Sequence, residues 1–375
     1  MRASIKASVL LMLIITCIFA SWQGVQASAV VSVRSDVCIN ISGPQVKARI
    51  QVSNTIESTE VENTALPDEN SSKIPKSDIQ LDQYIQNEPS LKQRWALEQI
   101  QALPPPPIND RNATVLVAIL DTGIDRDHED LNDRVIAEIN LTESATTDDI
   151  YGHGTHIAGI VTAKNDNDLG ILGLAPESRL INIKVADDKG RCQTSALTEG
   201  IIQAVDSGAN VINISIELRQ STPGLEEAID YAWKNGAVII AAAGNDGSET
   251  PVYPACYEDC IGVTAIRENG TLAPLANHGD WVDVAAPGFN IYSTLPDNNY
   301  GYKHGTSFAT AYVSGLAALL FSEVTDTNGD NKLNDEVRRA IYSGCHEIGV
   351  DGTGKGIISV SNSLAKVVAN PEPSS

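Results

Sequence analysis

Basic residues are scarce in this chain of 375 residues, where 26 lysines and arginines stand against 48 aspartates and glutamates. Phosphate binding needs concentrated Lys and Arg, so the resulting formal charge of −22 argues against a nucleic-acid partner. The excess of acid favours solubility and allows cation binding, but it names no substrate. Apolar residues make up 42% of the chain, which is enough for a sizeable core and argues against wholesale disorder.

Several metal and repeat signatures are also missing. The sequence has no CxxC pair and no HExxH motif, the spacings typical of zinc sites, and it has no internal repeat. It has six cysteines. Two of them lie in N-terminal segments that we expect to be removed. The other four allow three pairings: Cys192, Cys256, Cys260 and Cys345. Cys256 and Cys260 are spaced so that a bridge between them would close a small loop.

The N-terminus predicts export. Arg2 and Lys6 precede an apolar stretch, Ala7 to Ala20, and the small-residue pattern Val25-Gln26-Ala27 suits signal peptidase. The stretch is short for a membrane span of roughly 20 residues, so we interpret residues 1–27 as a signal peptide rather than an anchor. A lipoprotein cysteine at position 17 is the weaker alternative. We therefore expect a secreted, extracellular protein without stable membrane insertion, with association to the cell envelope left open.

Composition then divides the chain. Residues 28–90 are rich in Ser, Asn, Glu and Asp and are interpreted as a pro-segment or linker, with an exposed, cleavable stretch over 57–76. A packed domain is predicted over 91–369, starting near Arg94. Residues 370–375 form a short polar tail.

Apolar runs and helical patterns alternate within this domain. Runs rich in Val and Ile predict strands, and spaced apolar residues between them predict helices. The strands are expected at 114–120, 180–185, 210–215 and 237–243, and the helices at 194–207 and 224–235. Strands that are apolar on both faces indicate a parallel sheet covered by helices. The predicted fold is a three-layer α/β/α domain with a central, mostly parallel sheet, whose chemistry should lie beyond the carboxyl ends of its strands.

Two motifs place polar residues at such element ends. The first predicted strand ends in Asp121-Thr122-Gly123, although a lone DTG is more often a turn aspartate that caps the next segment. The second motif is Gly152-His153-Gly154, followed by an apolar helical run to Ala163. Histidine takes and returns a proton near neutral pH. The glycines around His153 let backbone and substrate approach closely, which favours a functional over a structural histidine.

Two further motifs supply a hydrogen-bond donor and a hydroxyl. A buried strand breaks at Ala243-Gly244 and presents the side-chain amide of Asn245, for which an ordinary turn is the alternative. Gly305-Thr306-Ser307 opens a helix through Phe321 that is apolar nearly all round and therefore buried. A helix N-terminus favours developing negative charge, although a serine there can be no more than an N-cap.

Together, and in the order Asp, His, Asn, Ser, these motifs resemble the subtilisin-like serine protease family (subtilases, peptidase S8) over about residues 94–368. The resemblance implies that Ser307 is the nucleophile, that His153 is the general base and then acid, and that Asp121 orients His153. Asn245 and the N–H of Ser307 would form the oxyanion hole. It further implies a serine endopeptidase that cleaves proteins through an acyl-enzyme, made as a zymogen that binds its own pro-segment. His156 and Asp125 match the motif positions less well.

The resemblance also implies where a substrate lies. Its backbone would add as a strand between residues 189–193 and 215–217. Glu217 stands where the family usually has glycine; its carboxylate could select a basic side chain, narrow the entrance of the primary pocket, or point to solvent. Val252 replaces a pocket-floor glycine and predicts a shallower pocket, and Ala311-Tyr312 replace Pro-His and should affect only helix packing. The expected contact residues are Gly190, Ser215, Ile216, Glu217 and Gly244.

Calcium is the cofactor that the resemblance implies. The polar loop 165–168 resembles the family's calcium loop, and such oxygen-rich loops suit the ion. The expected ligands are Asp130, Asn165, Asn167, Leu169 and Ile171. A second loop, 326–332, looks like the start of an EF-hand, but it has Asn331 in place of the usual Gly and Val337 in place of the usual Glu, so a solvated acidic loop is equally open.

Two other classes of protein fit the sequence less well. A non-catalytic peptide-binding homologue has no need of a nucleophile, its base and an oxyanion donor, and all three are present. An unrelated α/β hydrolase such as a lipase is excluded, because the chain has no G-x-S-x-G elbow and its catalytic order differs.

Overall fold

The computed structural model describes strands at 29–33, 37–41 and 49–52, together with residues 91–103, 114–165 and 170–368. The chain divides into two units, Met1–Ser72 and Lys73–Ser375. In the first unit, β1 (Ala29–Val33), β2 (Val37–Ile41) and β3 (Arg49–Val52) form an antiparallel sheet in that order. These three strands lie within residues 28–90, where no strand was predicted. The predicted signal peptide, the stretch 57–76 and the tail lie outside the described residues.

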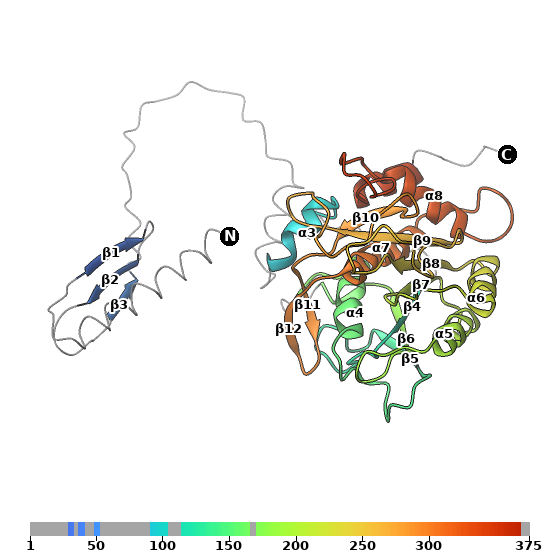
Figure 1. The fold of residues 1–375 in the computed structure, drawn as a ribbon, viewed down its shortest axis with the longest axis horizontal. Helices are drawn as coiled ribbons and strands as arrows, with labels where there is room; N and C mark the ends of the chain where they lie inside the picture. Colours follow the sequence, from blue (N-terminus) through green and yellow to red (C-terminus); the bar gives the residue numbers. More distant parts are fainter. Residues whose placement is uncertain are drawn as a thin grey trace, which may run out of the picture. The chain divides into compact units, whose positions relative to one another are not determined.

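The second unit is built on a seven-stranded sheet of order β10-β9-β8-β7-β4-β6-β5, in which every neighbouring pair is parallel (Figure 1). From β4 the chain first builds β5 and β6 on one side, and then crosses to build β7 to β10 on the other. The carboxyl end of β4 therefore lies at the switch point of the sheet, where parallel sheets place their sites. The strands are β4 (Leu116–Asp121), β5 (Val135–Asn140), β6 (Arg179–Lys184), β7 (Val211–Ile214), β8 (Val238–Ala242), β9 (Cys260–Ile266) and β10 (Val284–Pro287).

Helices cover both faces of this sheet (Figure 1), which confirms the predicted three-layer α/β/α fold. On one face lie α4 (Gly154–Thr162) and α7 (Thr306–Phe321), and on the other α5 (Thr194–Asp206) and α6 (Pro223–Lys234). The remaining elements are η1 (Leu91–Gln93), α3 (Arg94–Gln99), the antiparallel pair β11 (Ile291–Leu295) and β12 (Asn299–Lys303), α8 (Asn334–Gly344) and α9 (Val360–Val368).

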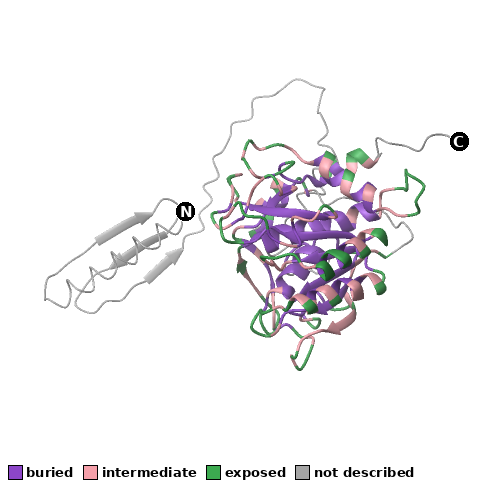
Figure 2. Cartoon of the chain, turned by 45° about the vertical axis from the view of Figure 1, so that its right-hand side comes forward, coloured by how far each residue is buried: buried purple, intermediate pink, exposed green. Residues whose placement is uncertain are grey.

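The two-faced core follows from the alternation of side chains along each strand. In β4, Val117 and Ile119 pack in the cluster that includes α4 and α7, whereas Ala118 and Leu120 pack in the cluster that includes α5 and α6. Figure 2 shows the buried residues concentrated in the sheet and the central helix. In α7 every residue except Leu319 is buried, so the start of this helix is held rigidly at the edge of the sheet.

The fold also bears on the predicted element bounds and on the cysteine pairing. The predicted strands and helices at 114–120, 180–185, 210–215, 237–243, 194–207 and 224–235 correspond to β4, β6, β7, β8, α5 and α6, with ends that differ by one or two residues. The four cysteines of the described part are free thiols, so the Cys256–Cys260 bridge that the spacing allowed is not formed. Within the described residues, no helix is both long and apolar enough to span a membrane.

Candidate active site

Asp121 and His153 come from different elements and meet at the carboxyl edge of the sheet. Asp121 is the last residue of β4, and His153 directly precedes α4. The two side chains are joined by a hydrogen bond of 2.7 Å between His153 Nδ1 and Asp121 Oδ1. Because the carboxylate can only accept, Nδ1 carries the proton, which leaves Nε2 as the acceptor toward a reacting group. Burial lowers the pKa of His153 and the Asp121 carboxylate raises it, with a net pKa above the ordinary value.

A second carboxylate, which the sequence analysis missed, holds this pair in place. Asp149 is buried and accepts hydrogen bonds from Thr122 Oγ1 at 2.7 Å and from the backbone N–H groups of Gly152 and Thr155 at 2.7 and 2.8 Å. It thus ties the segment after Asp121 to both sides of His153. The sequence carries no signal that separates it from its neighbour Asp148, because its role rests on these contacts.

Ser307 is the second residue of α7 and is 5% exposed. The ring of Phe308, its neighbour, lies 5.4 Å from the ring of His153, which brings the start of α7 to the histidine. Within the described residues, Ser307 Oγ forms no hydrogen bond to His153; the recorded side-chain bond of this histidine is the one to Asp121. Such catalytic bonds are often long in free enzymes and tighten when substrate binds.

Asn245 is fixed by the start of α7. Thr306 donates its backbone N–H to Asn245 Oδ1 at 2.9 Å. Since a backbone N–H is a donor, the atom that faces it must be the amide oxygen, and the NH₂ group of the exposed Asn245 side chain is left to bind a ligand. This donor and the N-terminus of the helix that carries Ser307 are therefore aimed at the same region, where negative charge is stabilised.

The two rival residues have structural contacts instead. His156 is fully buried, its Nε2 donates to the carbonyl of Gly301 at 3.2 Å, and its ring packs edge-on against Phe308. Burial lowers its pKa to about 3, so this imidazole stays neutral. Asp125 accepts from the backbone N–H groups of Asp127 and Asp297 at 3.1 and 2.8 Å, and it thereby braces turns rather than His153.

The expected substrate-binding segments lie beside strand ends. Ser215 and Ile216 directly follow β7, and Ser215 Oγ donates to the backbone carbonyl of Ser307 at 3.4 Å. Gly190 lies in a small hairpin closed by the bridge between Ala186 and Cys192. Its φ of +74° and the ring of Tyr151, only 2.9 Å from the position of an added Cβ, explain why glycine is needed there.

The residues that differ from the family pattern lie in three different environments. Val252 is buried in the apolar cluster beneath α5 and α6, so the predicted shallower pocket stays a prediction. Ala311 and Tyr312 are fully buried in the cluster around α7. Glu217 does not point to solvent: its Oε2 accepts the backbone N–H of Asn245 at 3.2 Å.

Part of the expected calcium site is described. Asp130 is fully buried, and its Oδ2 accepts from Ile171 N at 3.2 Å and from Tyr300 Oη at 3.0 Å, so a carboxylate, the type of hard oxygen donor that calcium prefers, lies against the residue that ends the expected loop. Asn165 fits less well, because its amide group already bonds the backbone of Gly173 in both directions. Asn167 and Leu169 lie outside the described residues. In the part of the chain that is described, no three His, Cys, Asp or Glu residues form a metal cluster.

The second candidate loop folds on itself. Asp326 accepts backbone N–H groups of the loop, including those of Gly329 at 2.7 Å and Asn331 at 2.8 Å, and Asp330 accepts that of Lys332. These bonds satisfy a solvated acidic loop without an ion.

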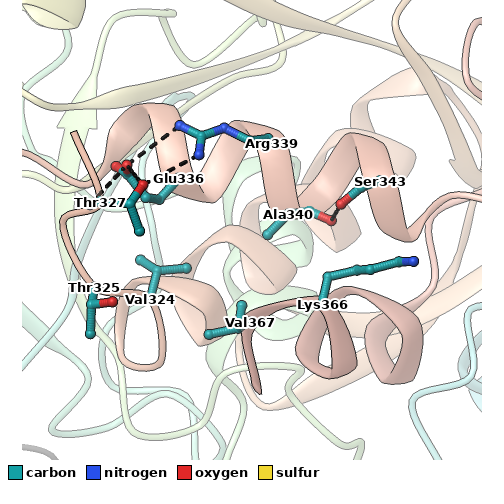
Figure 3. A pocket seen from close by; sticks show the side chains of 9 residues that line it. All are labelled: Val324, Thr325, Thr327, Glu336, Arg339, Ala340, Ser343, Lys366 and Val367. Atoms are coloured by element: carbon teal, nitrogen blue, oxygen red, sulfur yellow. Dashed lines mark hydrogen bonds and ion pairs between the residues drawn. The ribbon is translucent and has the colours of Figure 1, made fainter. Parts of the chain in front are cut away.

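A hollow at the C-terminal helices lies among none of the predicted site residues (Figure 3). Glu336 is bonded by Thr327 Oγ1 at 2.6 Å and by Arg339 at 3.4 Å, above an apolar floor that includes Val324 and Val367. Glu336 and Arg339 are paired with each other, and no histidine or cysteine is among the residues that line the hollow. The hollow therefore does not compete with the Asp121–His153 site.

Known proteins resemble this chain over the same region. The family model described as the subtilase family matches residues 112–345. A thermophilic serine proteinase of Bacillus sp. (strain AK1) is 43% identical over 238 residues, 63% of this chain and 58% of that protein, so the chain spans less than two thirds of it. Thermitase of Thermoactinomyces vulgaris is 38% identical over 63% of this chain and 83% of its own length. A subtilisin of Bacillus pumilus is 38% identical over 71% and 96%.

Proposed function

Because the chain belongs to the subtilase family of serine-type peptidases, we propose that it is a secreted serine endopeptidase with the triad Asp121, His153 and Ser307. The observation that carries this proposal is the 2.7 Å bond between Asp121 Oδ1 and His153 Nδ1, at the carboxyl edge of the sheet, where α7 begins and carries Ser307 as its second residue. This bond fixes the imidazole in the tautomer whose free Nε2 can accept the proton of a serine hydroxyl.

The reaction follows from these groups. Ser307 Oγ attacks the carbonyl carbon of a peptide bond while His153 Nε2 takes the hydroxyl proton, and Asp121 stabilises the imidazolium that forms. His153 then gives this proton to the leaving amine, the C–N bond breaks, and the acyl group remains as an ester on Ser307. Water then attacks the ester carbonyl while His153 takes its proton, and His153 returns that proton to Ser307 Oγ as the ester C–O bond breaks and the second product leaves.

Asn245 stabilises the oxyanion of the tetrahedral intermediates. Its NH₂ group and the backbone N–H of Ser307 donate to this oxygen. The bond from Thr306 N to Asn245 Oδ1 holds the amide in this orientation before substrate arrives, so the reaction needs no rearrangement of the donor.

Replacing Asn245 with alanine should lower kcat by about 10²–10³ and leave KM little changed, because the donor acts on charge that develops only in the transition state. Asn245→Asp is the matched variant, since it keeps an oxygen that can accept from Thr306 N but lacks the NH₂ donor. It should lose at least as much activity. Steady-state hydrolysis of a peptide anilide measures both constants. A kcat within about threefold of the wild-type value in either variant would remove Asn245 from the oxyanion hole.

Export and activation complete the proposal. We expect residues 1–27 to be removed by signal peptidase and residues 28 to about 90 to act as a pro-segment that the peptidase domain binds before its removal. The mature enzyme would act outside the cell or at its envelope on protein and peptide substrates. Purified protein freed of this segment should cut an unfolded protein internally, with new N-termini visible by mass spectrometry. A folded protein that yields no cleavage would leave the peptide-binding homologue as the function.

Calcium is proposed as a structural ion held by Asp130 and the loop that ends at Ile171, where the ion would add ligand bonds that stabilise the native state. We expect EDTA to lower the melting temperature and excess Ca²⁺, but not Mg²⁺, to restore it. Calcium at 100 times its Kd stabilises the folded state by about 2.7 kcal/mol. Calorimetry with and without the ion measures this shift, and Asn167→Ala should reduce it. Equal melting temperatures in EDTA and Ca²⁺ would contradict the proposed site.

A further inference from the structure

Glu217 reaches from the segment after β7 to the turn after β8. Its Oε2 accepts the backbone N–H of Asn245 at 3.2 Å. The same oxygen lies only 2.1 Å from the position that a Cβ on Gly244 would take. Gly244, with a φ of +97°, therefore has to be glycine for the carboxylate to lie there.

The turn that receives this carboxylate is held firmly. Gly244 N donates to Thr306 Oγ1 at 3.0 Å. The fully buried Asn277 donates to the carbonyl of Ala243 at 2.9 Å and accepts from the backbone N–H groups of Asp246 and Ser248. The turn therefore holds its backbone rigidly against Glu217, and only the side chain of Glu217 can move relative to it.

The charges around Glu217 do not balance. Arg219 pairs with Asp246 at 2.6 Å, across the same two segments. Within the described residues, no lysine, arginine or histidine forms a salt bridge with Glu217, so the guanidinium of Arg219 is paired with Asp246 and the carboxylate of Glu217 has no ion-pair partner. Partial burial and the nearby Asp246 raise the pKa of Glu217. A partly buried carboxylate without an ion-pair partner is stabilised when a ligand brings a cationic group to it.

The position of the carboxylate tells which substrate residue it meets. In the proposed function the NH₂ group of Asn245 donates to the carbonyl that reacts, and the backbone N–H of the same residue donates to Glu217. Glu217 therefore contacts the residue that supplies the oxyanion donor. The substrate side chain that comes nearest belongs to the residue that supplies the reacting carbonyl, on the acyl side of the scissile bond.

We propose that Glu217 is a specificity-determining residue that binds a lysine or arginine side chain at this position of the substrate. The inference rests on the proposed peptidase function and adds the substrate class to it. A residue that only narrowed the entrance would favour small side chains and would need no charge. The unbalanced carboxylate instead favours a cationic side chain, which pairs with it at the entrance rather than at the bottom of a deep pocket.

The test compares two peptides that are identical except for arginine or its neutral analogue citrulline at the acyl position. The wild-type enzyme should prefer arginine in kcat/KM by about 10- to 100-fold, the size of one hydrogen bond to a charged group. Glu217→Gln keeps the shape and an acceptor but removes the charge, so the ratio should fall to about one. Glu227→Gln, an exposed carboxylate of α6, controls for the overall loss of negative charge and should keep the wild-type ratio.

Two results would overturn the assignment and leave the peptidase in place. One is cleavage of both peptides with the same ratio in the wild type and in Glu217→Gln. The other is a wild-type preference for alanine or glycine that Glu217→Gly extends to large apolar residues, which would make Glu217 a plug. Cleavage of no peptide by the folded wild type would instead overturn the peptidase function and, with it, this inference. Melting curves of the variants separate a change of ratio from a loss of fold.

Discussion

Replacing Ser307 with alanine should lower kcat for peptide hydrolysis about 10⁶-fold, the loss typical when a triad nucleophile is removed. The expected loss is this large because the remaining donors and the imidazole have no acyl acceptor to activate. The fold should stay intact. Ser307 is small, and its Oγ forms no hydrogen bond within the described residues, so its removal leaves no buried group without a partner.

Ser314 of the same helix is the matched control. It is fully buried and its Oγ accepts from Asn213 Nδ2 at 2.9 Å, far from the reacting groups along α7. Ser314→Ala should cost about 1–3 kcal/mol of stability, because it leaves a buried amide without its acceptor, but it should keep kcat. Hydrolysis rates and urea denaturation separate the two effects. A Ser307→Ala variant that retains more than about one percent of wild-type kcat would mean that another residue is the nucleophile.

Replacing Asp121 with asparagine should lower kcat by about 10⁴. Asparagine presents either an amide oxygen or an NH₂ group to His153 Nδ1, so it neither fixes the productive tautomer nor stabilises the imidazolium. The pH profile should change as well. Only neutral His153 accepts the serine proton, so wild-type kcat/KM should rise with pH through a pKa above the ordinary 6.5 of the imidazole. Without the Asp121 carboxylate, burial and the charge of Lys303 lower the pKa of His153 and only the smaller influence of Asp149 raises it, so the rise should move to lower pH.

Asp125→Asn tests the same chemistry at the rival residue. Its carboxylate accepts only backbone N–H groups, which an asparagine oxygen can also accept, so kcat should stay within about threefold and the pH profile should not move. Initial rates from pH 5 to 9 for both variants decide between the two aspartates. A pH profile that shifts with Asp125→Asn but not with Asp121→Asn would contradict the triad.

The parts of the fold that could be predicted are those whose sequence pattern is local. Residues of β4, β7 and β8 are apolar on both faces because two helical layers cover them, and this produces continuous runs that are visible without the structure. β5, β9, β10 and the hairpin of β11 and β12 were not predicted. The residues of β5 and β12 are mostly half-exposed and mixed in polarity, so they form no continuous apolar run. β9 and β10 are fully buried, but β10 has only four residues, and the apolar run of β9 is interrupted by a glycine and a threonine.

In the candidate site, too, residues in local motifs could be predicted, whereas residues whose role depends on distant contacts could not. Asp121, His153, Asn245 and Ser307 stand at the ends of predicted elements and in short glycine-containing motifs, so their positions could be found in the sequence. Asp149 was missed because its role depends on three hydrogen bonds that form only when the chain folds back on itself. The direction of the Glu217 side chain likewise depends on the turn after β8, where its partner Asn245 lies 28 residues further along the chain and no spacing rule connects the two.

The most direct test of the central claim is labelling of the purified protein, freed of its pro-segment, with a fluorophosphonate probe, followed by mass spectrometry of the labelled peptide. An active triad makes one hydroxyl nucleophilic enough to displace fluoride, so we expect a single adduct on Ser307 that is absent in Ser307→Ala and strongly reduced in His153→Ala. A folded protein that takes up no label, or that carries the label on another residue, would contradict the assignment of Asp121, His153 and Ser307 as a catalytic triad.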